Sequence, residues 1–208
     1  MLAKWIVVDA SNRAAFDEAQ KRWSDLVEND GFIVQVGGWV ESFPAKAGII
    51  ALWRNFGTYR QFMETGHAET ALQQKETCER TEITVAGVIM HINQVDPRLL
   101  AGSAEFLRVS DVTLQPNSSP IFLARQLEIW NPVLRSADGM LGALVCRVDG
   151  NHDRFLSATF WRDRAALENF QATVFPATSK QAGTETYIQS RVTYHFALEP
   201  GWRVVKPP

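Results

Sequence analysis

The chain has 208 residues, of which 46% are hydrophobic and 21% are charged. This length allows one sizeable core or two small ones, and the composition is typical of a folded globular protein. The 21 basic and 23 acidic residues are interspersed and leave a net charge of −2, which argues against nucleic acid or an anionic membrane as a partner. No apolar stretch has the length of a membrane span, and the apolar run near the N-terminus is too short for a secretory signal. We therefore expect a cytoplasmic protein.

One stretch of the chain occurs twice. Trp53 ends an apolar run and is followed nine residues later by Phe62, and Trp161 ends a similar run and is followed nine residues later by Phe170. The two tryptophans are 108 positions apart, about half of the chain, which predicts two copies of one supersecondary unit. Because both copies retain the tryptophan, we expect it to anchor the core at the end of a strand.

The first copy is predicted to run strand, helix, two strands, helix, strand. β-branched and aromatic residues indicate the strands, and Ser11 or Asn12 supplies the cap of the first helix. The predicted strands are 2–8, 32–40, 47–53 and 82–92, the first helix ends near residue 27, and the second begins after Trp53 and is followed by helical turns at 68–75.

The second copy is predicted to repeat this order. Its strands are expected at 106–114, 139–148, 154–161 and 185–198, and Pro132 is expected to interrupt its first helix, because proline lacks a backbone donor. The boundaries that follow are a first repeat at 1–95, a linker at 96–104, and a second repeat at 105–208 that ends in a C-terminal tail.

The strands do not alternate between apolar and polar residues, as the runs at 5–8, 48–53 and 140–145 show. Helices cover only one face of a four-stranded sheet, so the other face also needs cover. We therefore predict an α+β fold, in which two ferredoxin-like βαββαβ repeats pack their antiparallel sheets into a single-chain pseudodimeric α+β barrel. The helices lie outside, and the sheets enclose a small, mostly apolar interior.

These residues resemble the dimeric α+β barrel superfamily, which includes antibiotic biosynthesis monooxygenases and haem-degrading monooxygenases. More closely, the chain is similar to a bacterial family typified by the YdbC protein. The matching stretches are 4–7, 35–39, 107–109, 130–132, 139–142 and 198–200. This resemblance spans nearly the whole chain and implies a fold, but it implies no activity.

The haem-degrading branch of that superfamily is not supported by the sequence. The resemblance would place its catalytic tryptophan at Phe62 or Phe170 and its haem-ligating histidine at Leu72 or Lys180. Phenylalanine has no indole N–H, and neither leucine nor lysine is a proximal haem ligand. His91, His152 and His195 show no metal-binding spacing either, so we predict no cofactor and no metal.

Two residues are candidates for a catalytic base. His67 lies at the edge of the buried stripe of the second helix, and a helix N-terminus there would favour its neutral form. The alternative is that His67 caps a helix or packs at the surface. Asp111 interrupts an apolar strand and is either a base, half of an ion pair, or a residue that ends the strand. Phe175 takes the place of His67 in the second copy, so the two halves are unequal.

Several polar or aromatic residues are candidates for substrate binding. The amides of Gln20, Gln35 and Gln126 lie on otherwise apolar faces, where they either bond within the core or orient a substrate carbonyl. Arg108 is a further candidate, and its strand parity places it on the opposite face from Asp111. The remaining candidates are Trp39 and the two residues before Pro132, Trp130 and Asn131. The alternative for these three is ordinary packing in the core.

The sequence leaves two functions open. The first is a binding protein or enzyme for a small apolar or aromatic metabolite. If it is catalytic, we expect cofactor-free, monooxygenase-like oxygenation or a proton transfer, with His67 or Asp111 as base and Gln35 and Trp39 positioning the substrate. The second is a non-enzymatic regulatory or assembly module with a filled core. The chain would be a monomer or a homodimer in either case.

Overall fold

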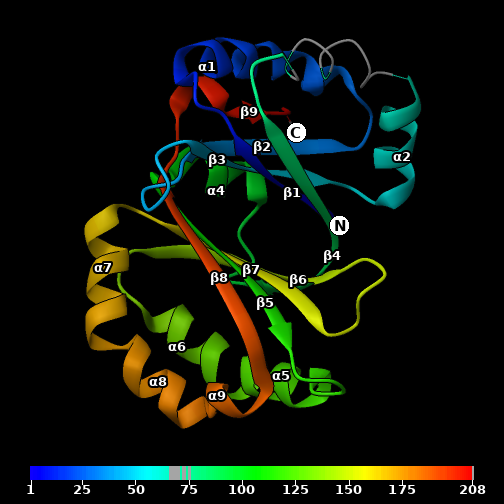
Figure 1. Cartoon of the computed structure of the whole chain (residues 1–208). Helices are drawn as coiled ribbons and strands as arrows, with labels where there is room; N and C mark the ends of the chain where they lie inside the picture. Colours follow the sequence, from blue (N-terminus) through cyan, green and yellow to red (C-terminus); the bar gives the residue numbers. More distant parts are fainter. Residues whose placement is uncertain (66–70, 72–73, 75, 208) are drawn as a thin grey trace.

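The structure is a computed structural model that describes residues 1–65, 71, 74 and 76–207. Most of its helices lie in two groups at opposite ends of the molecule, with the strands between them, and one helix, α4 (Pro97–Ser103), lies beside the strands (Figure 1). This arrangement is an α+β fold. Among the described residues, no helix is long and apolar enough to cross a membrane.

The elements of the first half follow the predicted order. They are β1 (Leu2–Asp9), α1 (Arg13–Lys21), η1 (Arg22–Glu28), β2 (Phe32–Trp39), β3 (Lys46–Trp53), α2 (Phe56–Thr65) and β4 (Arg80–Ile92). The cap of α1 is Asn12, whose side-chain oxygen accepts the backbone N–H of Ala15 at 3.1 Å. This bond satisfies one of the free donors at the start of the helix.

The second half contains more helix than predicted. Its elements are α4 (Pro97–Ser103), β5 (Phe106–Leu114), α5 (Ser119–Arg125), η2 (Gln126–Trp130), α6 (Asn131–Ser136), β6 (Met140–Val148), β7 (Arg154–Trp161), α7 (Arg164–Thr173), α8 (Phe175–Ala182), α9 (Thr184–Tyr187), β8 (Ile188–Ala197), η3 (Pro200–Trp202) and β9 (Val204–Val205). The segment expected to be a linker holds α4. The last long strand begins at Ile188 because α9 occupies the preceding residues.

The predicted interruption at Pro132 takes a different form. The helix continues through it, because one wide π-turn, η2, precedes the proline and Pro132 falls in the first turn of α6. Pro132 has no N–H to donate to the preceding turn, and the wider π-turn accommodates this missing bond. The α-helix is therefore interrupted at the expected place by a π-turn, but the chain stays helical through it.

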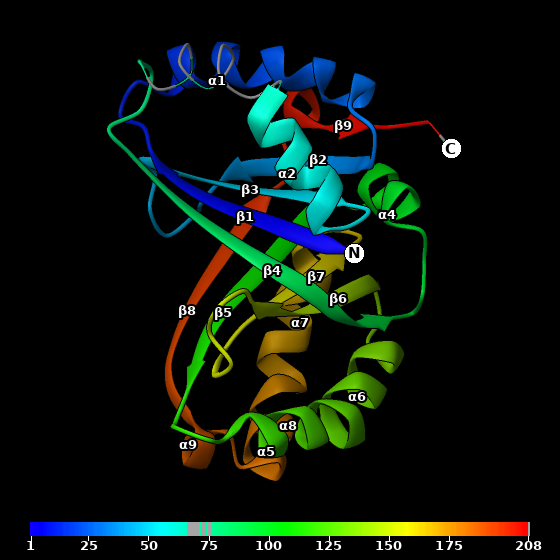
Figure 2. The ribbon, with the colours of Figure 1, turned by 90° about the vertical axis from the view of Figure 1, so that its right-hand side faces the viewer.

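The described strands form one antiparallel sheet of nine, in the order β8-β5-β7-β6-β4-β1-β3-β2-β9. The pairing of β4 with β6 joins the two halves, and Figure 2 shows how the sheet curls round from this join. At the far side, the N–H of Glu41 donates to the carbonyl of His195 at 3.0 Å and the N–H of Glu199 donates to the carbonyl of Gly37 at 2.9 Å. The curled sheet is thus almost closed.

The space inside the curled sheet is filled by side chains. A single cluster of buried residues draws on strands of both halves and includes Trp5, Leu52, Leu107, Leu144 and Phe196. Apolar residues from strands of both halves therefore cover one another inside a single curled sheet. The expected ligand space inside the barrel does not match this packing, because bulky side chains meet across the interior.

The repeated tryptophans lie at the ends of β3 and β7 and are fully buried. The ring of Trp53 lies 4.9 Å from that of Phe62, and the ring of Trp161 lies 5.2 Å from that of Phe170. The nine-residue spacing therefore brings the last residue of a strand against the following helix in both halves. Each pair closes the helix-covered side of its sheet.

The C-terminal tail packs on the first half of the chain. Trp202 is fully buried between Phe16 and Trp39, and its indole N–H donates to Asp17 at 2.6 Å. β9 then adds to the edge of β2. The tail assigned to the second repeat therefore covers an edge strand of the first.

Candidate functional site

Two cavities lie between the sheet and the helices, one in each half. We call the cavity among β5, β7, β8 and the helices α5 to α9 the C-terminal pocket; its volume is about 70 Å³. The cavity among β1, β2, β3, α1, η1 and α2 is the N-terminal pocket, with a volume of about 380 Å³. No residue of the central cluster lines either pocket in the described part of the chain.

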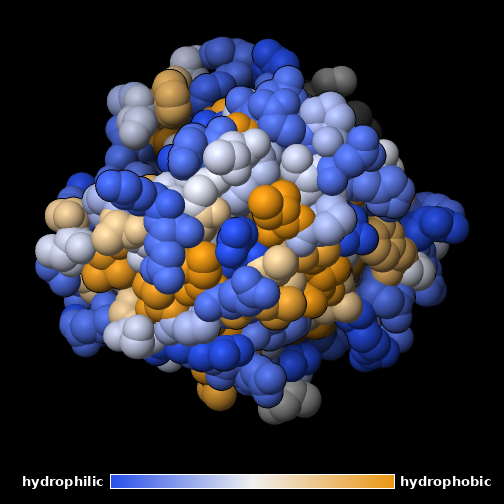
Figure 3. Space-filling model, turned by 90° about the horizontal axis from the view of Figure 1, so that it is seen from below, coloured by the Kyte–Doolittle hydropathy of each residue, from blue (hydrophilic) through white to orange (hydrophobic). Residues whose placement is uncertain are grey.

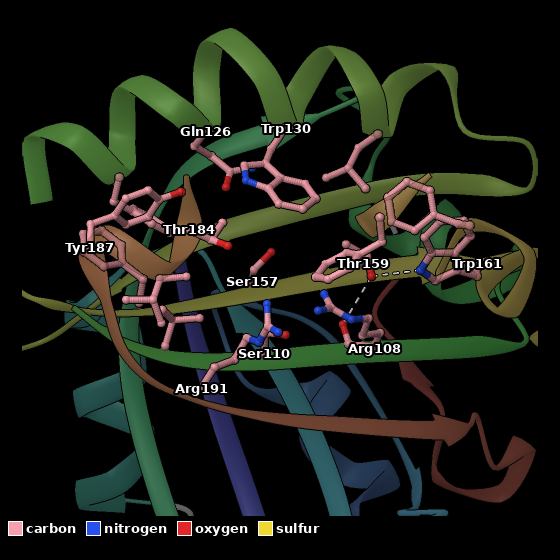
Figure 4. Close-up of a pocket in the computed structure, with 17 residues that line it drawn as sticks. Arg108, Ser110, Gln126, Trp130, Ser157, Thr159, Trp161, Thr184, Tyr187 and Arg191 are labelled. Carbon is pink, nitrogen blue, oxygen red and sulfur yellow. Dashed lines mark hydrogen bonds between the residues drawn. The ribbon is translucent and has the colours of Figure 1, made fainter. Parts of the chain in front are cut away.

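Aromatic rings form most of the wall of the C-terminal pocket. Five helical elements and β7 supply them (Figure 4), and they are Phe122, Trp130, Phe155, Trp161, Phe170, Phe175 and Tyr187. Hydroxyl groups of Ser110, Ser157 and Thr159 lie on the strand side. An apolar wall with a few polar groups is typical of small-molecule sites.

Two arginines bring positive charge to this pocket. The guanidinium carbon of Arg108 lies 5.6 Å from the ring centre of Phe175, and that of Arg191 lies 5.3 Å from the same ring. The Nε atom of Arg108 is buried and has no acceptor among the described residues. Burial, and secondarily the charge of Arg191, lower the pKa of Arg108 to about 10. No aspartate or glutamate is among the described residues that line the pocket.

His195 pairs with Arg108 across β8 and β5 and therefore lies on the same face of the sheet. Burial, and then the charge of Arg108, lower the pKa of His195 to about 4. Its Nε2 atom lies 3.1 Å from the amide nitrogen of Gln171. The ring is thus neutral near pH 7. Within the described residues, no group of three or more His, Cys, Asp or Glu side chains is arranged to hold a metal.

The π-turn η2 places two candidate residues in the wall of the C-terminal pocket. Gln126 and Trp130 are its first and last residues, and both side chains point from the helix toward the strands (Figure 4). Gln126 donates to the side-chain oxygen of Asn131 at 2.8 Å, and the indole of Trp130 hydrogen-bonds to Tyr187. Wide turns of this kind are frequent at functional sites.

Of the two predicted bases, the structure describes Asp111 alone. His67 lies outside the described residues. Asp111 lies on the opposite face from Arg108, as parity predicts, and accepts two hydrogen bonds from Arg154 at 2.9 and 2.5 Å. It is therefore half of an ion pair, which was the structural alternative. His195 is a titratable residue beside the pocket that the sequence did not single out, because its neighbour Arg108 comes from a distant strand.

The N-terminal pocket holds two of the predicted amides. Gln20 accepts from Gln74 at 2.6 Å, so its oxygen is satisfied. Gln35 is 4% exposed and its Nε2 atom has no acceptor among the described residues. Trp39 does not line this pocket; it packs on Phe16 and Trp202. The structure thus brings Gln20 and Gln35 together and places Gln126, Trp130 and Arg108 elsewhere.

A buried lysine in this pocket was missed by the sequence analysis. Lys4 is 5% exposed and lies two residues after Leu2, which pairs with Trp53. Arg108 lies two residues after Phe106, which pairs with Trp161 in the same way. The two pockets therefore have a cation at corresponding positions, of which Lys4 is buried and Arg108 is half-buried. The sequence does contain a signal for this pair. Each of the two apolar strands has a single cation, and the two cations precede the repeated tryptophans by similar numbers of residues.

Comparison with known proteins gives matches in both halves. The profile of a domain of unknown function, DUF4937, matches residues 2–86, and that of antibiotic biosynthesis monooxygenases matches residues 107–175. The uncharacterized protein YdbC of Bacillus subtilis (strain 168) is 40% identical over 91 residues, which are 41% of this chain and 76% of YdbC. The chain belongs to the YdbC family. The resemblance stated from the sequence is confirmed.

Solved structures resemble nearly the whole of this YdbC-family chain. A candidate monooxygenase of Lactobacillus acidophilus NCFM has a TM-score of 0.72 at 11% identity, over 99% of this chain and 96% of that one. An anthrone oxidase-like protein has a TM-score of 0.69 at 10% identity, over 95% and 91%. At such identities the likeness establishes the fold, an α+β architecture with a curled antiparallel sheet, and not the chemistry.

Proposed function

We propose that this protein binds a small aromatic molecule that carries an acidic group, and that the molecule lies in the C-terminal pocket. The observation that carries the proposal is Arg108, a half-buried arginine whose buried Nε atom has no acceptor among the described residues. It lies in an aromatic cavity whose described lining has no carboxylate. Burying a charge without a counter-ion is costly, because water no longer stabilises it. A carboxylate or phenolate of the ligand would supply the counter-charge, while its ring packs on the aromatic wall.

The volume of the C-terminal pocket, about 70 Å³, leaves no room for a ligand larger than a single ring. Arg191 is exposed, in contrast to the buried Nε atom of Arg108, so it would attract an anion at the rim while Arg108 holds it inside. Neutral His195 adds no third positive charge at pH 7. These contacts support selection for anionic over neutral aromatic molecules.

For the reaction we propose cofactor-free oxygenation of a phenol to a quinone, in keeping with the antibiotic biosynthesis monooxygenase match at residues 107–175. One oxygen atom of O₂ becomes the new carbonyl, and the other leaves as water with the two hydrogens that the phenol loses. The described lining of the pocket offers no histidine or carboxylate as base. The phenol must therefore be acidic enough to enter as its anion, which Arg108 would stabilise.

We also propose that the chain is a tandem pseudodimer of two ferredoxin-like repeats. The strand orders β4-β1-β3-β2 and β8-β5-β7-β6 support it, because each is the same arrangement of four strands. The separate profile matches on either side of α4 support it as well. Exposed hydrophobic residues are spread over several elements and form separate patches at the end of the molecule seen in Figure 3, which favours a ligand site over an assembly surface.

The binding proposal is tested with two matched probes, 3-hydroxybenzoate and 3-hydroxybenzamide, which differ in charge and little in shape. Calorimetric titration should show binding of the acid and much weaker binding of the amide. Arg108→Met should weaken binding of the acid by about 10- to 100-fold, because a charge-assisted hydrogen bond contributes about 1.5–3 kcal/mol. Arg162→Met, which removes an exposed arginine of the same half, is the control.

Equal affinity for the acid and the amide, or an unchanged affinity in Arg108→Met, would contradict the proposal. The reaction is tested separately by oxygen consumption with 3-hydroxybenzoate, whose position opposite the hydroxyl is free to become a carbonyl. Binding without oxygen consumption would leave a binding protein and remove the oxygenation.

A further inference from the structure

The N-terminal pocket contains an amine in an unusual environment. Lys4 projects from β1 into the cavity and is 5% exposed. Its Nζ atom lies 5.6 Å from the ring centre of Tyr59, and no ion pair or hydrogen bond of the described residues involves it. Burial lowers the pKa of Lys4 to about 8. About one lysine in ten at this position is therefore a neutral amine at pH 7, compared with about one in 3,000 for an ordinary lysine.

A hydrogen-bond donor faces this amine across the floor of the pocket. Lys4 pairs with Ala51 on β3, and Ala51 pairs with Gln35 on β2, so the three side chains form a row on one face of the sheet. Two strand spacings separate Lys4 from Gln35, which is about 10 Å between their Cα atoms. The methyl group of Ala51 leaves space between them. The Nε2 atom of Gln35 and the Nε1 atom of Trp53 are both buried without an acceptor among the described residues.

We propose that the N-terminal pocket is a second ligand site, which takes a small molecule with an aldehyde or ketone group, and that Lys4 forms an imine with it. The amine lone pair adds to the carbonyl carbon, and the carbon–oxygen double bond opens. Proton transfer from nitrogen to oxygen and loss of water then give the carbon–nitrogen double bond. The carbonyl oxygen would accept the unused N–H of Gln35 while the amine attacks.

The charged groups around the pocket favour this chemistry over simple binding of an anion. The titratable group that packs on Lys4 is the phenol of Tyr59, whose pKa burial raises, so it is neutral. Glu79 and Arg80 line the opposite end. Arg80 pairs with Asp9, five residues along β1 from Lys4, or about 16 Å away. Among the described residues, the amine thus has no nearby opposite charge to hold its proton. The corresponding Arg108 of the other pocket cannot act as a nucleophile.

The test is reductive trapping with benzaldehyde and sodium cyanoborohydride, which converts the imine into a stable secondary amine. The whole protein is treated at pH 7, and the labelled residues are located by fragment-ion mass spectrometry, which separates Lys4 from the α-amine of Met1. We expect Lys4 to be labelled at least about tenfold faster than Lys21 and Lys180, because of its larger neutral fraction. Gln35→Leu should slow the labelling of Lys4 and leave that of Lys21 unchanged.

Lys4→Arg retains a cation and should remove the label at this position only. Lys21→Arg is the matched control and should not change labelling of Lys4. If Lys21 and Lys180 are labelled while Lys4 is not, the proposal is overturned. It is also overturned if benzoate, but not benzaldehyde, stabilises the protein through Lys4, since that result would assign an anion site. None of these outcomes depends on the C-terminal pocket, so the proposed function can fail or stand independently.

Discussion

Lys4→Met should make the protein more stable near neutral pH, and the gain should shrink as the pH rises. The pKa of Lys4 falls from 10.5 to about 8 on folding. At 1.36 kcal/mol per unit, the charged form costs the folded state about 3 kcal/mol at pH 7. Methionine fills a similar volume without the charge. Loss of the contact with the ring of Tyr59 offsets about 0.5–1 kcal/mol, so the net gain should be about 2 kcal/mol.

The pH dependence of the stability difference shows whether the buried charge of Lys4 is its cause. Between pH 8 and 10.5 the unfolded chain keeps the Lys4 proton that the folded chain has released, so the stability of the natural protein rises with pH in this window. The cost of the charge falls to about 1.5 kcal/mol at pH 9.5. Urea unfolding of both proteins at pH 7 and pH 9.5 measures the change, and Lys180→Met, on the exposed surface of α8, is the control. A difference that stays constant with pH, or a less stable variant at pH 7, would refute the reasoning.

Three further predictions concern other parts of the fold. Gly38→Ala should destabilise the protein by about 2 kcal/mol or more, because an added Cβ would lie 1.9 Å from a carbonyl oxygen of β8. Thermal unfolding measures this change, and Gly102→Ala, which has open space around it, is the control. Asp111→Asn should cost about 1–3 kcal/mol in urea unfolding, since it weakens a bidentate pair with Arg154; an unchanged midpoint would contradict this. His195 should stay neutral from pH 7 down to about pH 5 in NMR titration, because its pKa is about 4. The free energy of unfolding should fall below about pH 6.5, because the unfolded chain then binds a proton on His195 that the folded chain does not.

The strands and their facing residues could be read from the sequence because they depend on local patterns. Apolar runs marked the eight long strands, Asn12 was recognised as a helix cap, and the Trp53 spacing pointed to the contact with Phe62. Parity along β5 also placed Arg108 and Asp111 on opposite faces. These features follow from the two-residue period of a strand and from the chemistry of a helix end.

The location of the cavities could not be read in the same way. The strands are apolar on both faces, so periodicity did not distinguish the filled interior from the helix-covered side. A cavity remains where helices from distant parts of the chain do not fill the space above the sheet. Its size depends on the side-chain volumes of residues far apart in the sequence, which a short stretch of sequence does not show. The partner of Asp111 and the absence of one for Gln35 within the described residues have the same origin.

By itself, the sequence determined the order of the elements, the repeated strand-end tryptophans and the family. Tertiary structure decided which face of the sheet holds a cavity and which buried cations lack a counter-charge. In the sequence, Lys4 and Arg108 are two cations in apolar strands, and nothing local sets them apart. In the folded chain, distant segments shield them from water, and the described residues place no carboxylate beside them. The cost of burying a charge depends on all the groups that surround it.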